Sequence, residues 1–253
     1  MTATQEAPPP LSPDISVKPV NTRPKRAPFP VNLYQTAVGK KWVMAITGIM
    51  MMGFLFAHMI GNVKMYLGAE EYDAYAAGLR SLLYPILPHN VALWLMRGGL
   101  IVALLLHLHS AYSLTMMNNR ARQKYQGGRD YIAANYASMA MRLTGIWVLL
   151  FIVFHLLNLT FGKVGDPGFE SEDVYNNVVS AFSQWWVSVI YIASMVVLAL
   201  HLFHGAWSMF QSLGINNPRF NAARKYFAVA FAVIVCGINI TFPIAVLAGV
   251  VGK

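Results

Sequence analysis

Residues 185–213 read WWVSVIYIASMVVLALHLFHGAWSMFQSL and contain no Asp, Glu, Lys or Arg. A helix rises about 1.5 Å per residue, so this stretch exceeds the roughly 20 apolar residues that cross the hydrocarbon core of a bilayer. Four more apolar runs lie near residues 42–62, 91–117, 141–162 and 227–251. In lipid a helix satisfies every backbone donor within its own segment. We therefore predict an all-α integral membrane protein with five transmembrane helices.

The N-terminal part of the chain has a different composition. Its first 30 residues include eight prolines and no run of apolar side chains, so they cannot build a core or hold a helix. We expect residues 1–34 to be a disordered, Pro-rich cytoplasmic tail and residues 35–253 to be one transmembrane domain. A cleaved secretory signal is not expected, because the first apolar run is full length and four more follow it.

Orientation follows from Lys and Arg, which accumulate on the cytoplasmic side of a membrane. With the N-terminus inside, fourteen of the nineteen Lys and Arg residues fall in the cytoplasm, and seven of the ten acidic residues fall outside. The N-terminus is therefore expected in the cytoplasm and the C-terminus outside, in a bacterial cytoplasmic (inner) membrane. The net charge of +9 is then mainly a topology signal and does not indicate nucleic-acid binding.

The single cysteine excludes several kinds of redox centre from this chain. Cys236 lies within the fifth apolar run, and neither a C-x-x-C-H motif nor a cysteine cluster is present. A c-type haem or an iron–sulfur cluster therefore has no ligand set here. The chain also lacks the G-x-G-x-x-G fingerprint of dinucleotide binding.

Four histidines occupy the first four apolar runs, one each: His58, His109, His155 and His201. By helical rise, His58 and His155 lie roughly 25 and 20 Å from the cytoplasmic starts of their helices, and His109 and His201 lie about 14 and 15 Å from the cytoplasmic ends of theirs. This predicts an outer pair from helices one and three and an inner pair from helices two and four. Two such pairs are what two bis-histidine haems stacked across a bilayer require.

Two neighbouring histidines complicate the inner pair. His107 and His109 are two residues apart, about 200° around a helix, so only one of them faces a given haem. His204 and His201 are three apart and share a face more nearly. A lone histidine in a span is more often a helix-to-helix hydrogen-bond partner than a ligand, and it is the depth matching of four that favours haem.

Four short motifs resemble those of a known family. They are F-L-F-A-H-M-I-G-N at 54–62, H-S-A-Y-S at 109–113, M-R-L-T-G-I at 141–146 followed by F-H at 154–155, and H-L-F-H-G-A-W-S at 201–208. Together they resemble the five-helix, two-haem cytochrome b anchor of succinate:menaquinone oxidoreductases, over roughly residues 35–250. The resemblance implies haem ligation by His58 with His155 and by His109 with His201, leaving His204 without a ligand role.

The same resemblance implies the partners and the chemistry. A cytoplasmic flavoprotein subunit carrying FAD would oxidise succinate, an iron–sulfur subunit would pass the electrons on, and this anchor would relay them through two b haems to menaquinone. Another dihaem cytochrome b would share the histidine pattern without the quoted motif contexts. A haem-free proton-conducting membrane protein is the third alternative, and a reduced-minus-oxidised visible spectrum separates it from the other two.

Five further side chains are candidates for the ends of the haems and for quinone. Lys41 and Arg142 begin helices one and three and are candidates for the inner haem's propionates, or else they only anchor helix ends by snorkelling. Arg97 lies two turns inside helix two, where an unpaired charge is costly, so we expect it to serve the outer haem or a quinone. Tyr66 and Glu70 are quinone-site candidates, with ordinary loop residues as the alternative.

Overall fold

The computed structural model describes residues 28–124, 132–165, 168–215 and 217–252, and this part of the chain is helical without a strand. The helices are α1 (Val31–Tyr34), α2 (Ala37–Val63), α3 (Ala69–Arg80), α4 (Val91–Lys124), α5 (Ile132–His155), α6 (Val174–Ser183), α7 (Trp185–Ser212) and α8 (Asn221–Leu247), with short 3₁₀ turns η1 (Lys64–Leu67) and η3 (Pro218–Phe220) and a π-helical turn η2 (Leu156–Thr160).

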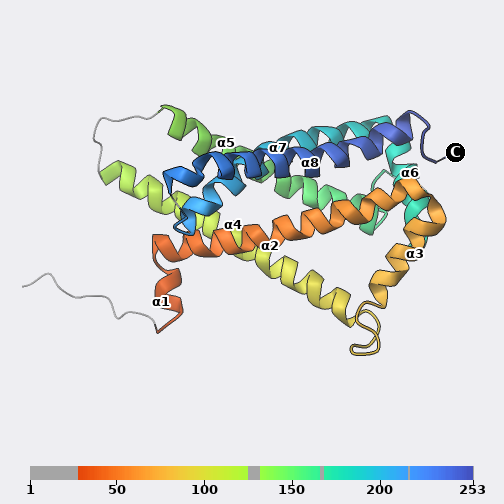
Figure 1. The fold of residues 1–253 in the computed structure, drawn as a ribbon, viewed down its shortest axis with the longest axis horizontal. Coiled ribbons are helices and arrows are strands. Elements are labelled where there is room, and N and C mark those ends of the chain that lie inside the picture. The colour runs from red at the N-terminus through yellow and green to blue at the C-terminus, as the bar shows by residue number, and fades with distance from the viewer. Residues whose placement is uncertain (1–27, 125–131, 166–167, 216, 253) are drawn as a thin grey trace, which may run out of the picture.

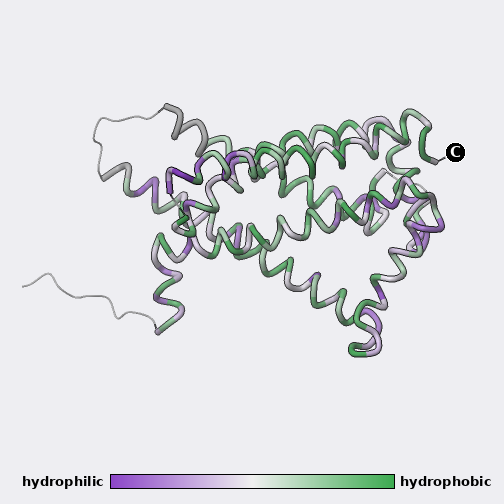
Figure 2. The backbone as a smooth tube through the Cα atoms, viewed as in Figure 1, coloured by the Kyte–Doolittle hydropathy of each residue, from purple (hydrophilic) through white to green (hydrophobic). Residues whose placement is uncertain are grey.

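Five helical stretches are long and apolar enough to cross a membrane, which confirms the predicted number of spans. They cover Ala37–Leu67, Val91–Ala121, Met139–Thr160, Trp185–Ser212 and Pro218–Leu247. Hydrophobic residues run the length of these helices, and hydrophilic residues gather near their ends and in α3 (Figure 2). The first span begins five residues earlier than expected because Thr36 caps α2, its hydroxyl accepting the Gly39 N–H at 2.9 Å.

Helices α2, α4, α5 and α7 form an open four-helix bundle, and α8 packs beside it (Figure 1). Helix α2 packs along α4 and also against α7, and α7 packs along α5. Helices α2 and α5 are therefore diagonal partners, as are α4 and α7. Helix α8 lies along α7 and touches α2, with Cys236 buried between them next to Met59 and Met195.

The start of the domain differs from the prediction. Residues 1–27 of the expected tail lie outside the described residues, but residues 31–34, assigned to that tail, form the single turn α1. Tertiary contacts hold this turn: the Lys40 ammonium donates to the Tyr34 carbonyl at 3.0 Å and lies over the Tyr34 ring. Gly39 allows the approach, since a Cβ there would collide with the Leu33 carbonyl. Proline content predicted a tail that reaches residue 34, but it carries no information about the tertiary contacts that hold α1.

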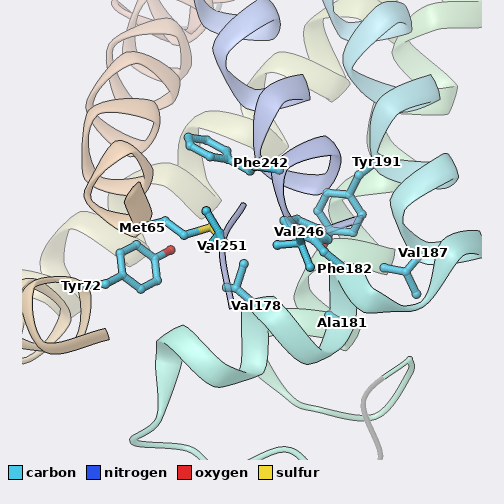
Figure 3. Packing of buried hydrophobic residues seen from close by; sticks show 11 residues of the cluster. Met65, Tyr72, Val178, Ala181, Phe182, Val187, Tyr191, Phe242, Val246 and Val251 are labelled. Carbon is cyan, nitrogen blue, oxygen red and sulfur yellow. The ribbon is translucent and has the colours of Figure 1, made fainter. Parts of the chain in front are cut away.

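The opposite end of the bundle is covered by α3 and α6, two helices that the five apolar runs do not include. Here Met65, Tyr72, Val178, Phe182 and Val251 bury their side chains in one cluster that links α3, α6 and the chain's C-terminal segment (Figure 3). Burial, reinforced by the neighbouring Asp73 and Tyr75, raises the pKa of Tyr72 to about 12, so its hydroxyl stays protonated and donates to Asn62. We call the two ends of the bundle the α1 end and the α3–α6 end.

Candidate functional site

Two histidines from diagonal helices meet near the α3–α6 end. His58 of α2 and His155, the last residue of α5, have ring centroids 5.9 Å apart with the rings nearly perpendicular at 86°. Each ring packs near a phenylalanine one turn earlier in its own helix, Phe54 for His58 and Phe151 for His155. The structure therefore brings together the two side chains that the sequence assigned to the outer pair.

A chain of hydrogen bonds holds the ring of His155. Its Nδ1 lies 3.1 Å from the hydroxyl of Tyr191 on α7, and that hydroxyl donates to the Asn158 side-chain carbonyl at 2.9 Å. Asn158 is fully buried on the π-helical turn directly after His155, and its amide donates to the Val164 carbonyl. Because the Tyr191 proton is used toward Asn158, its oxygen accepts from Nδ1–H of His155. The other ring nitrogen, Nε2, is then left with its lone pair.

A second group of side chains lies nearer the α1 end. His201 of α7 has its Nδ1 3.2 Å from the Thr144 hydroxyl on α5, and His107 of α4 has its Nδ1 3.2 Å from the Thr47 hydroxyl on α2. Each threonine donates its own proton to the carbonyl one turn earlier, Val43 for Thr47 and Ala140 for Thr144. Both hydroxyl oxygens therefore accept from an Nδ1–H, which again leaves Nε2 with its lone pair.

The α4 histidine that interacts electrostatically with His201 in this structure is His107, whereas the sequence favoured His109 as its partner. His107 and His204 both lie close enough to His201 to interact with it electrostatically. The 200° between His107 and His109 puts the His109 ring on another face of α4. His204 packs its ring near Phe203 on its own helix.

His109 instead fixes α1 to the bundle. Its Nδ1 lies 2.5 Å from the Tyr34 hydroxyl, the two rings stack with centroids 5.7 Å apart, and the same hydroxyl contacts the buried Ser110. With Lys40 bonded to the Tyr34 carbonyl, this cluster joins α1, α2 and α4. The sequence could not show it, because Tyr34 lies 75 residues from His109 and was assigned to the tail.

The two groups lie at two levels of one bundle. Thr47 and His58 are 11 residues apart in α2, and Thr144 and His155 are 11 residues apart in α5. Eleven residues at 100° each bring a side chain back to nearly the same helix face, about 16 Å further along the axis. The same faces of α2 and α5 therefore carry a threonine at the level of His107 and His201 and a histidine at the other level.

This register follows an internal repeat in the sequence. Residues 44–58 read M-A-I-T-G-I-M-M-M-G-F-L-F-A-H, and residues 141–155 read M-R-L-T-G-I-W-V-L-L-F-I-V-F-H. Methionine, threonine, glycine, isoleucine, phenylalanine and histidine recur at the same spacing in both. This repeat is the signal that would have identified Thr47 and Thr144 before the structure was known.

The three predicted basic residues are not brought to the histidine pairs. Lys41 and Arg142 are exposed, and it is the preceding residue, Lys40, that is buried. Arg97 is also exposed, and its guanidinium lies over the Trp94 ring, 5.0 Å from the centroid, one turn earlier in α4. The charge at this depth is thus partnered by an aromatic face.

The other two quinone-site candidates, Tyr66 and Glu70, lie in η1 and in α3. Tyr66, in η1, donates its hydroxyl to Thr241 of α8 at 2.6 Å and packs near Phe242. Glu70 is exposed in the first turn of α3, where a carboxylate favours the helix dipole. Tyr66 therefore serves to join the first and fifth spans.

The donor set fits a haem better than a metal held by protein alone. In the described residues, no three His, Cys, Asp or Glu side chains converge on one point. A haem supplies four nitrogens and needs only two axial ligands, usually histidine. His58 and His155, whose ring centroids lie 5.9 Å apart, are a pair of histidines that could hold such a haem.

Comparison with known proteins gives one match. Neither a curated protein nor a solved structure matches the chain. Residues 115–240, which are 126 of the 253, match the model of one protein family. That segment spans the last ten residues of α4, then α5, α6, α7 and most of α8, and it includes His155, Thr144 and His201. That family is the succinate dehydrogenase/fumarate reductase transmembrane subunits, to which this segment is similar, and the described residues include five helices able to cross a membrane.

Proposed function

We propose that this chain is the dihaem cytochrome b anchor of a succinate:menaquinone oxidoreductase. The observation that carries the proposal is the arrangement of four histidines in two pairs on the two diagonals of the bundle, His58 with His155 and His107 with His201. The family match supports a membrane subunit of this enzyme class, and the quoted motifs support the dihaem type.

The hydrogen bonds at the two levels support axial ligation. A histidine that binds a metal usually donates its other ring N–H to a fixed acceptor, which selects the tautomer and orients the ring. His155, His107 and His201 each have such an acceptor: Tyr191, Thr47 and Thr144. Three of the four proposed ligands thus present Nε2 in the form that coordinates iron.

The bundle gives these ligands a setting suited to electron relay. Haem bound at the two levels would supply one-electron transfer between them. Apolar side chains of α2, α5 and α7 pack together in the interior of the bundle, and the buried cluster around Tyr191 closes the α3–α6 end. Levels about 16 Å apart along the helix axes divide the span into two shorter steps.

Sidedness and partners complete the proposal. The distribution of Lys and Arg supports a cytoplasmic α1 end in a bacterial inner membrane, so His107 and His201 would lie nearer the subunits that carry FAD and iron–sulfur clusters. Those subunits would oxidise succinate and deliver electrons to this level, and menaquinone would receive them from the chain of two haems. Cys236 is buried and single, in keeping with iron–sulfur clusters belonging to a partner subunit.

A haem count on the purified complex tests the proposal. The pyridine haemochrome assay should find two b-type haems per chain, and a reduced-minus-oxidised spectrum should show both. His58→Ala and His155→Ala should each remove one haem, and His107→Ala and His201→Ala the other. His109→Ala is the matched control and should keep both. One haem or none in the wild-type complex would contradict the proposal.

A further inference from the structure

We propose that Thr47 and Thr144 are twin positioning residues that orient His107 and His201 and set the redox potential of the haem between them. The proposal rests on the proposed function, because it concerns the haem held at that level. It assigns a role to two hydroxyls that contact neither substrate nor iron.

The two contacts have the same geometry. In both, the Thr Oγ1 lies 3.2 Å from an imidazole Nδ1 on the neighbouring helix. Thr47 of α2 contacts His107 of α4, and Thr144 of α5 contacts His201 of α7. In both, the hydroxyl proton is already directed to a carbonyl of its own helix, at 2.7 Å for Thr47 and 2.8 Å for Thr144. The oxygen can therefore only accept from the ring, and the ring can take only one tautomer.

The residue after each threonine supports the same role. A Cβ added to Gly48 would lie 3.7 Å from Cε1 of His107, and one added to Gly145 would lie 3.4 Å from Cε1 of His201. Each imidazole edge therefore rests close to a glycine, where a larger side chain would push the ring away. The Thr-Gly pair supplies an acceptor and the space for the ring beside it.

Ordinary back-bonding does not account for this pattern. Threonines in helices often donate to the carbonyl one turn earlier without any further partner. Thr115 of α4 does so toward Ala111 at 2.8 Å, and no ring nitrogen is among its hydrogen-bond partners in the described residues. Thr47 and Thr144 add a ring contact across a helix interface. They also occupy the same place in the internal repeat, 11 residues before a histidine.

The effect on potential has a definite sign. A hydrogen bond from Nδ1–H to an oxygen makes the imidazole a stronger electron donor to its metal. A stronger donor favours the ferric over the ferrous state, so the threonines lower the potential of the haem that they serve. Replacing either by valine, which has nearly the same shape but no oxygen, should raise that potential.

The test is a redox titration of the two haems in the purified complex, with low-temperature EPR of the ferric state. Thr47→Val and Thr144→Val should each raise the potential of the haem that His107→Ala removes and leave the other unchanged. The EPR signal of that haem should shift in both. Thr47→Ser and Thr144→Ser keep the oxygen and should behave as wild type, and Thr115→Val is the matched control.

Every outcome of this experiment decides between a positioning and a structural role. Loss of the haem in the valine variants with retention in the serine variants supports the proposal, since removing an orienting partner typically weakens metal binding about 10–100-fold. Unchanged potentials and EPR signals in both valine variants, with two haems bound, would overturn it. Loss of the haem in valine and serine variants alike would also overturn it. A wild-type complex without two haems would instead refute the proposed function.

Discussion

On the proposed function, Tyr191→Phe should loosen the haem at the α3–α6 end without disturbing the helix bundle. The Tyr191 hydroxyl accepts from His155 and donates to Asn158, and both partners are in the interior. The ring itself packs against Phe182 and Phe151, contacts that phenylalanine keeps. The substitution therefore removes two hydrogen bonds and changes almost nothing else.

The size of the effect follows from those bonds. A typical buried hydrogen bond contributes about 0.5–1.5 kcal/mol net, and a buried acceptor left without a donor costs about 1–3 kcal/mol. Asn158, which is 0% exposed, loses the donor to its side-chain oxygen, so we expect a total loss of about 1–3 kcal/mol at this site. His155 also loses the acceptor that selects its tautomer, and the haem bound by His58 and His155 should take a higher potential.

The assay is release of haem from the purified complex on heating, followed by its visible spectrum, together with a redox titration. Tyr191→Phe should release the haem of His58 and His155 at a lower temperature than wild type and raise its potential, while the other haem stays unchanged. Tyr112→Phe is the control, because Tyr112 is 68% exposed on α4. Identical release and potential in Tyr191→Phe and wild type would refute the reasoning from the hydrogen-bond chain.

Three other substitutions follow from the same geometry. Gly145→Val should displace the imidazole that rests beside it and reduce the content of the inner haem, measured by pyridine haemochrome; full occupancy would show that the ring has room to move. Arg97→Leu should keep both haems but lower the potential of the outer haem or reduce succinate-dependent menaquinone reduction, because a positive charge is removed; if both match wild type, Arg97 serves only to stack on Trp94. Tyr34→Phe should speed hydrogen exchange in α1 up to about tenfold, the equivalent of ~1.4 kcal/mol, through loss of its bond to His109, with haem content unchanged; unaltered exchange would mean that other contacts hold α1.

The five spans were predictable because their signal is local and strong. A run of some 20 apolar residues has few alternatives to a transmembrane helix, and its presence does not depend on what packs against it. The helices α3 and α6 lack such a run. They form because their buried faces, Tyr72 in α3 and Val178 and Phe182 in α6, meet the end of the bundle. That packing depends on contacts between distant parts of the chain.

Sequence spacing could not decide between His107 and His109 as the partner of His201. Both lie in the same apolar run at nearly the same depth, so depth alone could not separate them. The face of α4 that meets the bundle is set by its packing on α2, where Thr47 and Gly48 receive the ring of His107. No second histidine lies close to His58 or His155 in the sequence, and the structure places their ring centroids 5.9 Å apart.

The two levels also differ in the side chains that surround their histidines. Tyr191 lies ten residues before His201 in α7, and Arg97 lies ten residues before His107 in α4, so helical rise puts Arg97 and Tyr191 at a similar distance from the inner histidines. In α7 that position supports a ligand ring through a neutral hydroxyl, and in α4 the same position carries a permanent positive charge. Arg97 is exposed and lies over the Trp94 ring, so its charge is not placed at a histidine pair. The inner level has two hydroxyl acceptors, Thr47 and Thr144, that favour the ferric state, against the single acceptor Tyr191 at the other level. On the proposed function, this difference would make electron transfer from the α1 end toward the α3–α6 end the downhill direction in intrinsic potential.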